Sequence, residues 1–117
     1  MASPSTAIES PLLTHLPRHV AVFRCKQCSI ELALQDELVS RSFSGSHGPA
    51  YLVRSTINTN VGSKASKVLL TGKHTIAPIA CAGCNRELGW TYFTAPDQSQ
   101  KYKEGKSILE KVRTGGD

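Results

Sequence analysis

The chemistry that this sequence can support is concentrated in its four cysteines. They form two Cys-x-x-Cys units, Cys25–Cys28 and Cys81–Cys84, with residues 29–80 between the units. A tight turn can bring both thiolates of such a unit onto one metal ion, and four sulfur ligands in a tetrahedron suit Zn²⁺. The spacing therefore predicts one structural zinc ion with four ligands, Cys25, Cys28, Cys81 and Cys84.

The residues around the cysteines carry further signals. Gly83 lies inside the second unit and is able to take a left-handed backbone conformation if the turn requires it. Arg24, Lys26 and Arg86 flank the units, and nearby positive charge favours the thiolate form of cysteine. A site with four protein ligands keeps no open position for water, so we expect no hydrolysis at the metal and no enzyme activity.

Two other interpretations of the cysteines stay open at this point. Disulfides would form in an oxidising compartment, and a single Cys-x-x-Cys unit can act as a thiol oxidoreductase when one thiol is exposed and reactive. The sequence shows no signal-peptide pattern and no apolar run of bilayer-spanning length. We therefore expect a protein of the nucleus or cytoplasm, not secreted and not in a membrane, where reducing conditions disfavour disulfides.

The composition indicates one small domain with a modest core. Of the 117 residues, 39% are hydrophobic and 6% are aromatic, and the net charge is +5 at pH 7. A structural zinc ion supplies about 10–16 kcal/mol of apparent binding energy, which would compensate for a small core. The mild positive charge permits acidic protein partners or nucleic acid without requiring either.

Prolines and glycines suggest how the chain is divided. Residues 1–17 contain three of the six prolines, so we expect a flexible N-terminal tail there. The ordered zinc-binding domain is placed at residues 18–113. Residues 114–117 include two glycines and are expected to form a frayed C-terminus.

Strand signals dominate this domain because runs of β-branched and aromatic residues recur between turn signals. Residues 29–40 carry apolar side chains at a spacing of four, which favours either a helix or an irregular loop. A turn signal at 60–63 suggests that the strands on either side of it pair as a hairpin, and Pro78 indicates an edge or a bend. The expected strands are 19–24, 50–58, 67–72, 74–80, 88–93 and 107–112.

Longer motifs around the cysteines resemble the Yippee-like family. Besides the two cysteine units and the gap between them, the similar segments are 43–48 (Phe-Ser-Gly-Ser-His-Gly), 50–52, 69–75 (Leu-Leu-Thr-Gly-Lys-His-Thr), 88–92 (Leu-Gly-Trp-Thr-Tyr) and 99–106. They cover most of the predicted domain. The resemblance implies a mainly β fold called a β-tent, in which two antiparallel sheets meet at a steep angle and are pinned near the apex by a zinc site of four cysteines.

The same resemblance implies kinship with the thalidomide-binding domain of cereblon, with the Yippee domain of Mis18 and, more distantly, with B-type methionine sulfoxide reductases. The four cysteines leave none for the extra catalytic thiol of those reductases. The cereblon domain holds a small imide ring in an aromatic cage, but this chain has one tryptophan and cannot form a cage of three. By this resemblance, a peptide end or cyclic imide would meet His47, His74, Trp90 and Tyr92. The alternatives are a buried core role for Trp90 and hydrogen-bonded structural roles for the histidines.

We therefore expect a non-enzymatic, zinc-stabilised module that binds protein partners. The family resemblance implies cell-division, stress or ubiquitin-ligase-linked processes. The first alternative is a nucleic-acid-binding zinc module, for which Tyr102 among Lys101, Lys103 and Lys106 offers a candidate patch. The second, less favoured alternative is a thiol oxidoreductase.

Overall fold

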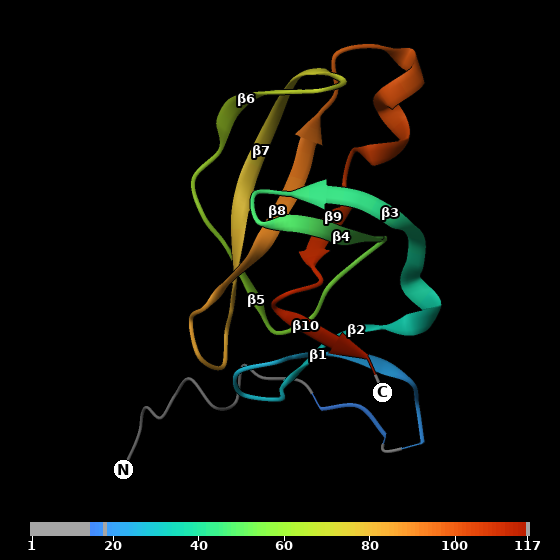
Figure 1. Cartoon of the computed structure of the whole chain (residues 1–117), viewed down its shortest axis with the longest axis vertical. Coiled ribbons are helices and arrows are strands. Elements are labelled where there is room, and N and C mark those ends of the chain that lie inside the picture. Colours follow the sequence, from blue (N-terminus) through green and yellow to red (C-terminus); the bar gives the residue numbers. More distant parts are fainter. Residues whose placement is uncertain (1–14, 18, 117) are drawn as a thin grey trace.

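Strands make up most of the computed structural model, which describes residues 15–17 and 19–116 (Figure 1). Neither of the two short 3₁₀ helices in this described part, η2 (Gln35–Glu37) and η3 (Gln98–Lys103), has the length or apolar character needed to span a bilayer. The strands are β1 (Val22–Cys25), β2 (Glu31–Leu34), β3 (Leu38–Gly45), β4 (Gly48–Val53), β5 (Thr59–Val61), β6 (Ala65–Leu69), β7 (Gly72–Cys81), β8 (Glu87–Thr94), β9 (Ser107–Glu110) and β10 (Thr114–Gly116).

These strands form two antiparallel sheets. The smaller sheet has the order β10-β1-β2, and the larger has the order β3-β4-β9-β8-β7-β5, with β6 also paired to β7. Figure 1 shows the smaller sheet at one end of the molecule, with its strands running across the direction of β7 and β8. The predicted mainly β fold with two antiparallel sheets is confirmed.

The larger sheet carries a hydrophobic cluster on each face. Neighbouring residues on its central strands alternate between the clusters, as Leu52 and Val53 do on β4 and Ile108 and Leu109 do on β9. The metal-side core consists of Phe23, Cys25, Leu32, Ala33, Val53, Ile79, Cys81, Leu88 and Leu109. The aromatic core consists of Ala50, Leu52, Ile76, Trp90, Tyr92 and Ile108, with Phe43 and Leu69 packed against it.

The segment 29–40 is neither a helix nor an irregular loop. It contains β2, the single turn η2 and the start of β3. Its apolar residues at a spacing of four do not distinguish a helix from a strand, because four is also a multiple of the two-residue strand period. Leu32, halfway between two of those positions, is fully buried, and its neighbours Glu31 and Ala33 are buried as well, so β2 is covered on both faces.

The predicted hairpin between 50–58 and 67–72 is wrong. β4 ends at Val53 and pairs with β3 and β9, whereas β6 pairs with β7, the next strand along the chain. Asn58, with φ of 56°, lies just before β5 and interrupts the extended run that the sequence suggested. The other four predicted strands overlap β1, β7, β8 and β9.

Pro78 lies inside β7 rather than at an edge of the sheet. On one side of β7, β5 ends opposite Ile79 and β6 begins opposite Ile76, so a short break in pairing falls at Pro78. The carbonyl of Pro78 accepts a hydrogen bond from the Gly62 amide across this break. Because a residue's N–H and C=O point to the same side of a strand, the missing donor of Pro78 falls where no ladder partner is required.

The two ends of the domain also differ from expectation. Residues 114–116 form β10 on the edge of β1, with Thr114 opposite Cys25, instead of fraying. Of the expected N-terminal tail, residues 1–14 lie outside the described residues. The Leu16 amide donates to the Glu31 carboxylate, and the His15 ring lies 3.3 Å from it, so the last residues of that segment contact β2.

Candidate metal centre

The two Cys-x-x-Cys units fold into equivalent turns. The first follows β1 and the second follows β7, so each begins at the last residue of a strand. In the first, the Ser29 amide donates to the Cys25 carbonyl at 2.8 Å, and in the second the Asn85 amide donates to the Cys81 carbonyl at 2.7 Å. The matched hydrogen bonds mean that two distant segments present their cysteines in the same local geometry.

In the second turn, the left-handed residue is not Gly83, which the sequence suggested. Ser29 has φ of 68° and Asn85 has φ of 67°, whereas Gly83 is not among the residues with positive φ. A side chain at Gly83 would instead meet sulfur, because a Cβ there would lie 3.0 Å from the Cys28 Sγ and 3.6 Å from the Cys81 Sγ. The role of Gly83 is therefore to leave room for the sulfurs rather than to supply an unusual backbone angle.

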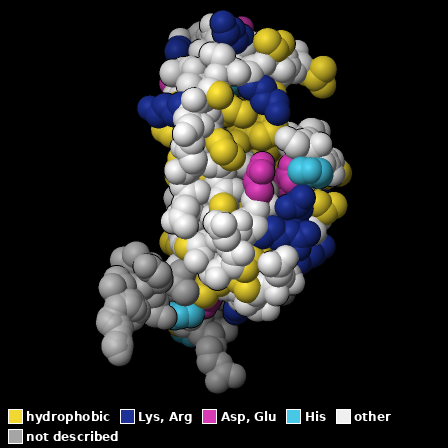
Figure 2. Space-filling view, turned by 90° about the vertical axis from the view of Figure 1, so that its left-hand side faces the viewer, with side chains coloured by type: hydrophobic (Ala, Val, Ile, Leu, Met, Phe, Trp, Pro, Cys, Tyr) yellow, Lys and Arg dark blue, Asp and Glu magenta, His cyan; other side chains and the backbone are white. Residues whose placement is uncertain are grey.

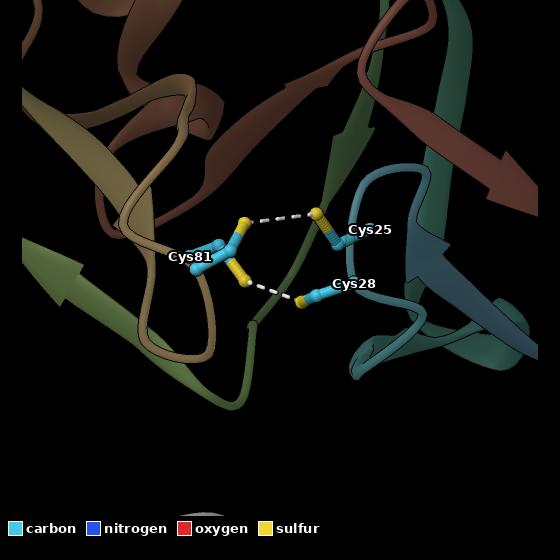
Figure 3. Close-up of side chains that lie close together, drawn as sticks. Cys25, Cys28 and Cys81 are labelled. Atoms are coloured by element: carbon cyan, nitrogen blue, oxygen red, sulfur yellow. Dashed lines mark hydrogen bonds between the residues drawn. The ribbon is translucent and has the colours of Figure 1, made fainter.

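The four sulfurs lie in a single cluster. The Sγ atoms of Cys25 and Cys84 are 3.6 Å apart, those of Cys28 and Cys81 are 3.5 Å apart, and all four lie within 4.8 Å of one another. Figure 3 shows Cys25 and Cys28 extending from one turn toward Cys81 on the other. A disulfide would need about 2.05 Å. Sulfurs bound at about 2.3 Å to one tetrahedral ion lie roughly 3.8 Å apart, so the cluster fits a metal site.

Burial opposes ionisation of the clustered thiols. Burial raises the pKa of Cys81 to about 12, and burial also raises the pKa of Cys28. Burial disfavours the Cys25 thiolate too, but hydrogen bonds from the backbone of Cys28 and Gln27 outweigh it, so the pKa of Cys25 is lowered. A metal ion supplies the positive charge that lets buried thiols ionise and bind.

Two of the flanking cations, Arg24 and Arg86, form hydrogen bonds that support the turns. Arg24 donates to the Ser29 carbonyl within the first turn at 3.1 Å. Arg86, beside the second turn, donates to the Gln27 side chain in the first at 3.4 Å, which joins the two units directly. With four sulfurs converging on one point, the site is suited to holding an ion between the sheets.

Three of the four predicted pocket residues gather in or against the aromatic core. The Trp90 and Tyr92 rings point to the same face of β8, with centroids 6.1 Å apart in an edge-to-face arrangement. His74 on β7 lies 5.6 Å from the Tyr92 ring and bonds through Nδ1 to the Gly72 carbonyl. His47 is separate, in the β3–β4 turn, where its backbone amide and its Nδ1 both contact the buried Glu110 carboxylate.

A groove opens beside Trp90. We name it the Trp90 groove; it has a volume of about 210 Å³, and its lining includes Ala65, Ser66, Lys67, Pro78, Glu87 and Trp90. Of the four predicted pocket residues, only Trp90 lines it. The Lys67 ammonium lies 5.1 Å from the centre of the Trp90 ring, a cation–π distance that holds this lysine at the rim.

The sequence did not reveal the role of Lys103. It belongs to the predicted basic patch around Tyr102, yet it is only 4% exposed, and its ammonium lies 5.5 Å from the Phe43 ring and 5.4 Å from the Tyr92 ring. Burial lowers the pKa of Lys103, although Asp97 opposes this, and the amine donates to the Thr71 hydroxyl. Its neighbours in the sequence are mostly lysines and polar residues, so only the three-dimensional packing distinguishes it.

Known proteins resemble this chain in sequence. Residues 21–115 match the family model described as Yippee zinc-binding/DNA-binding/Mis18, centromere assembly. The chain is 48% identical over 97 residues to protein yippee-like 4 of Homo sapiens, covering 83% of this chain and 76% of that protein. It is 44% identical over 95 residues to the yippee-like protein of Solanum tuberosum, covering 81% and 74%.

A solved structure supports the fold independently. The crystal structure of the Mis18 "Yippee-like" domain superposes with a TM-score of 0.65, covering 84% of this chain and 95% of that one, at 16% identity. At that identity the likeness concerns the fold alone. The family-model match and the sequence identities agree with the paired cysteine turns, and the chain therefore belongs to the Yippee–Mis18 family.

Proposed function

We propose that this chain is a non-enzymatic protein-interaction module whose two sheets are joined by one structural Zn²⁺ on Cys25, Cys28, Cys81 and Cys84. The observation that carries the proposal is the clustering of four sulfurs from two segments within 4.8 Å. A complete set of four sulfur ligands favours zinc and leaves no position at which the ion could activate water. The metal then stabilises the fold instead of taking part in a reaction.

Surface features support protein binding as the activity. The lining of the Trp90 groove includes the aromatic ring of Trp90 and the charged residues Lys67 and Glu87, a combination that suits a peptide segment or a small polar ligand. The description of the family includes centromere assembly, a process carried out by protein complexes. We extend this to partners in cell-division, stress or ubiquitin-ligase-linked processes, in the nucleus or cytoplasm.

The test measures metal content and partners on the same preparations. Purified native protein is expected to contain one zinc per chain, and tagged protein is expected to retain a reproducible set of partners from cells. Cys81→Ser removes one buried ligand and should lose zinc, thermal stability and those partners together. A native preparation without zinc, or one that retains no partner when its zinc is complete, would refute the proposal.

A nucleic-acid-binding module is the second candidate. The family description names DNA binding, and the exposed Lys101 and Tyr102 offer charge and one ring for stacking. Retention on DNA or RNA that weakens steeply with salt would favour it. A thiol oxidoreductase is less favoured, because all four cysteines belong to the sulfur cluster, and it would need a titratable free thiol in the zinc-loaded protein.

A further inference from the structure

β6 is an open edge of the larger sheet. It pairs with β7 on one side, and no other strand of the described chain pairs with it. Four of its five residues are exposed, and only Leu69 at its end is partly buried. An unpaired edge presents a row of backbone donors and acceptors, on which a further strand can form.

The pairing register shows which residues of β6 face outward. The β6–β7 hairpin closes with Leu69 opposite Gly72, so only two residues form the turn. Residues of such a closing pair direct their N–H and C=O groups at each other, and every second residue along the strand does the same. Lys67 and Ala65 therefore face β7, whereas Ser66 and Val68 present their backbone groups to the outside.

The charge of this edge indicates the kind of strand that would fit. Residues 64–73 contain Lys64, Lys67 and Lys73 and no acidic residue. Figure 2 shows lysine or arginine side chains and hydrophobic side chains gathered in the upper half of this side of the molecule. Two copies pairing through β6 would bring like charges together, which is destabilising, whereas a strand with aspartate or glutamate would be complementary.

The surroundings of the β6 edge include exposed apolar side chains and the Trp90 groove. Val68 is 78% exposed and Leu70, in the adjoining turn, is fully exposed. Ala65, Ser66 and Lys67 of β6 form part of the lining of the Trp90 groove, so the groove lies directly beside this strand. Alternate side chains of an added strand point to opposite faces, and those on one face would meet the groove.

We propose that β6 binds an extended acidic segment of a protein partner as an additional strand, with an apolar side chain of that segment in the Trp90 groove. This names the surface and the partner chemistry of the protein-binding function proposed above, and rests on it. Backbone hydrogen bonds to Ser66 and Val68 supply affinity, and the lysines and the groove select acidic segments with an apolar residue.

The experiment begins with a random peptide library displayed on phage and selected on the zinc-loaded full-length protein. The best acidic peptide is synthesised with a fluorescent label and again with every second amide N-methylated, which blocks strand pairing without changing charge. Binding is measured by fluorescence anisotropy and by the emission of Trp90, the one tryptophan of the chain. The unmodified peptide should bind saturably, and methylation in the pairing register should weaken binding by about tenfold or more.

Charge-reversal variants locate the site. Lys67→Glu combined with Lys73→Glu should weaken the same peptide by about tenfold, since it replaces two attractive charges with repulsive ones. Arg41→Glu is the control for a charge reversal elsewhere, because Arg41 is an exposed cation on β3, the edge strand at the far side of the same sheet. It should leave the affinity within about twofold of the native value. Zinc content is measured for each variant to show that folding is intact.

Each contrary result has a distinct meaning. Strand addition at β6 would be overturned, while protein binding elsewhere still stood, by any of three results. These are selected peptides that are not acidic, a methylated peptide that binds as tightly as the unmodified one, and equal effects of the β6 and β3 variants. Displacement by an oligonucleotide but not by acidic peptides, or dimerisation through β6, would give the edge another occupant and also overturn it. Loss of zinc or of all cellular partners in the native protein would refute the proposed function itself.

Discussion

At the scale of single residues, each cysteine turn has a residue other than glycine at its left-handed position. Asn85 suits this conformation because its short polar side chain can bond locally, and Ser29 occupies the same place in the first turn. Gly83 lies inside the second turn, facing the sulfurs of both units. Substitution at Gly83 therefore tests the space around the four sulfurs, separately from backbone strain.

We expect Gly83→Ala to weaken zinc binding by about tenfold, as changes next to metal ligands commonly do. The added methyl would lie 3.0 Å from the Cys28 Sγ and would displace that ligand by a few tenths of an ångström. Competition with a chromogenic chelator measures the affinity. Gly115→Ala is the control, because a Cβ there meets nothing nearer than the Lys26 side chain at 3.7 Å. Equal affinities of the two variants would show that the space at Gly83 does not matter.

The clustering of the four cysteines could be predicted from the sequence, whereas the positions of most of the predicted pocket residues could not. A Cys-x-x-Cys unit is a local pattern, so its chemistry is visible without knowledge of strand pairing. Trp90 and Tyr92 alternate along β8 and share a face as their spacing predicts. The position of His47 depends on Glu110, a residue 63 positions away, and no local pattern encodes that contact.

At the scale of elements, the strands were easier to predict than their partners. β7, β8 and β9 follow runs of β-branched and aromatic residues. The pairing of β4 with β9 joins residues far apart in the chain, and a turn signal cannot reveal it. The same holds for β10, whose glycines suggest a loose end until the open edge of β1 is seen beside them.

Deleting residues 114–117 should lower the melting temperature by roughly 5–15 °C, because the ladder between β10 and β1 would be lost. Thr114 lies opposite Cys25, so β10 also supports the strand end at which the first cysteine turn begins. Calorimetry on zinc-loaded protein measures the change. Deletion of Asp117 alone is the control, since it leaves β10 intact, and a four-residue deletion that melts like this control would contradict the prediction.

At the scale of the whole molecule, the two hydrophobic cores depend on the same strands. β4 and β9 each contribute adjacent residues to opposite faces, and β8 carries both Leu88 of the metal-side core and Trp90 of the aromatic core. A metal ion held by the four cysteines would join the end of β1 to the end of β7, and thus the smaller sheet to the larger. Loss of the metal would loosen the packing of the metal-side core, and the aromatic core depends on the same strands.

Metal release and disruption of the aromatic core should therefore occur in one transition. Trp90 is 5% exposed, so its emission is expected to shift to longer wavelength when the aromatic core opens. Titration with a strong chelator, followed by circular dichroism and Trp90 emission, should give coincident curves, because structural zinc supplies about 10–16 kcal/mol against a total domain stability of about 5–15 kcal/mol. Chelator saturated beforehand with zinc is the control. Unchanged Trp90 emission after complete metal removal would show that the aromatic core stays folded without the metal, and that zinc stabilises only the smaller sheet.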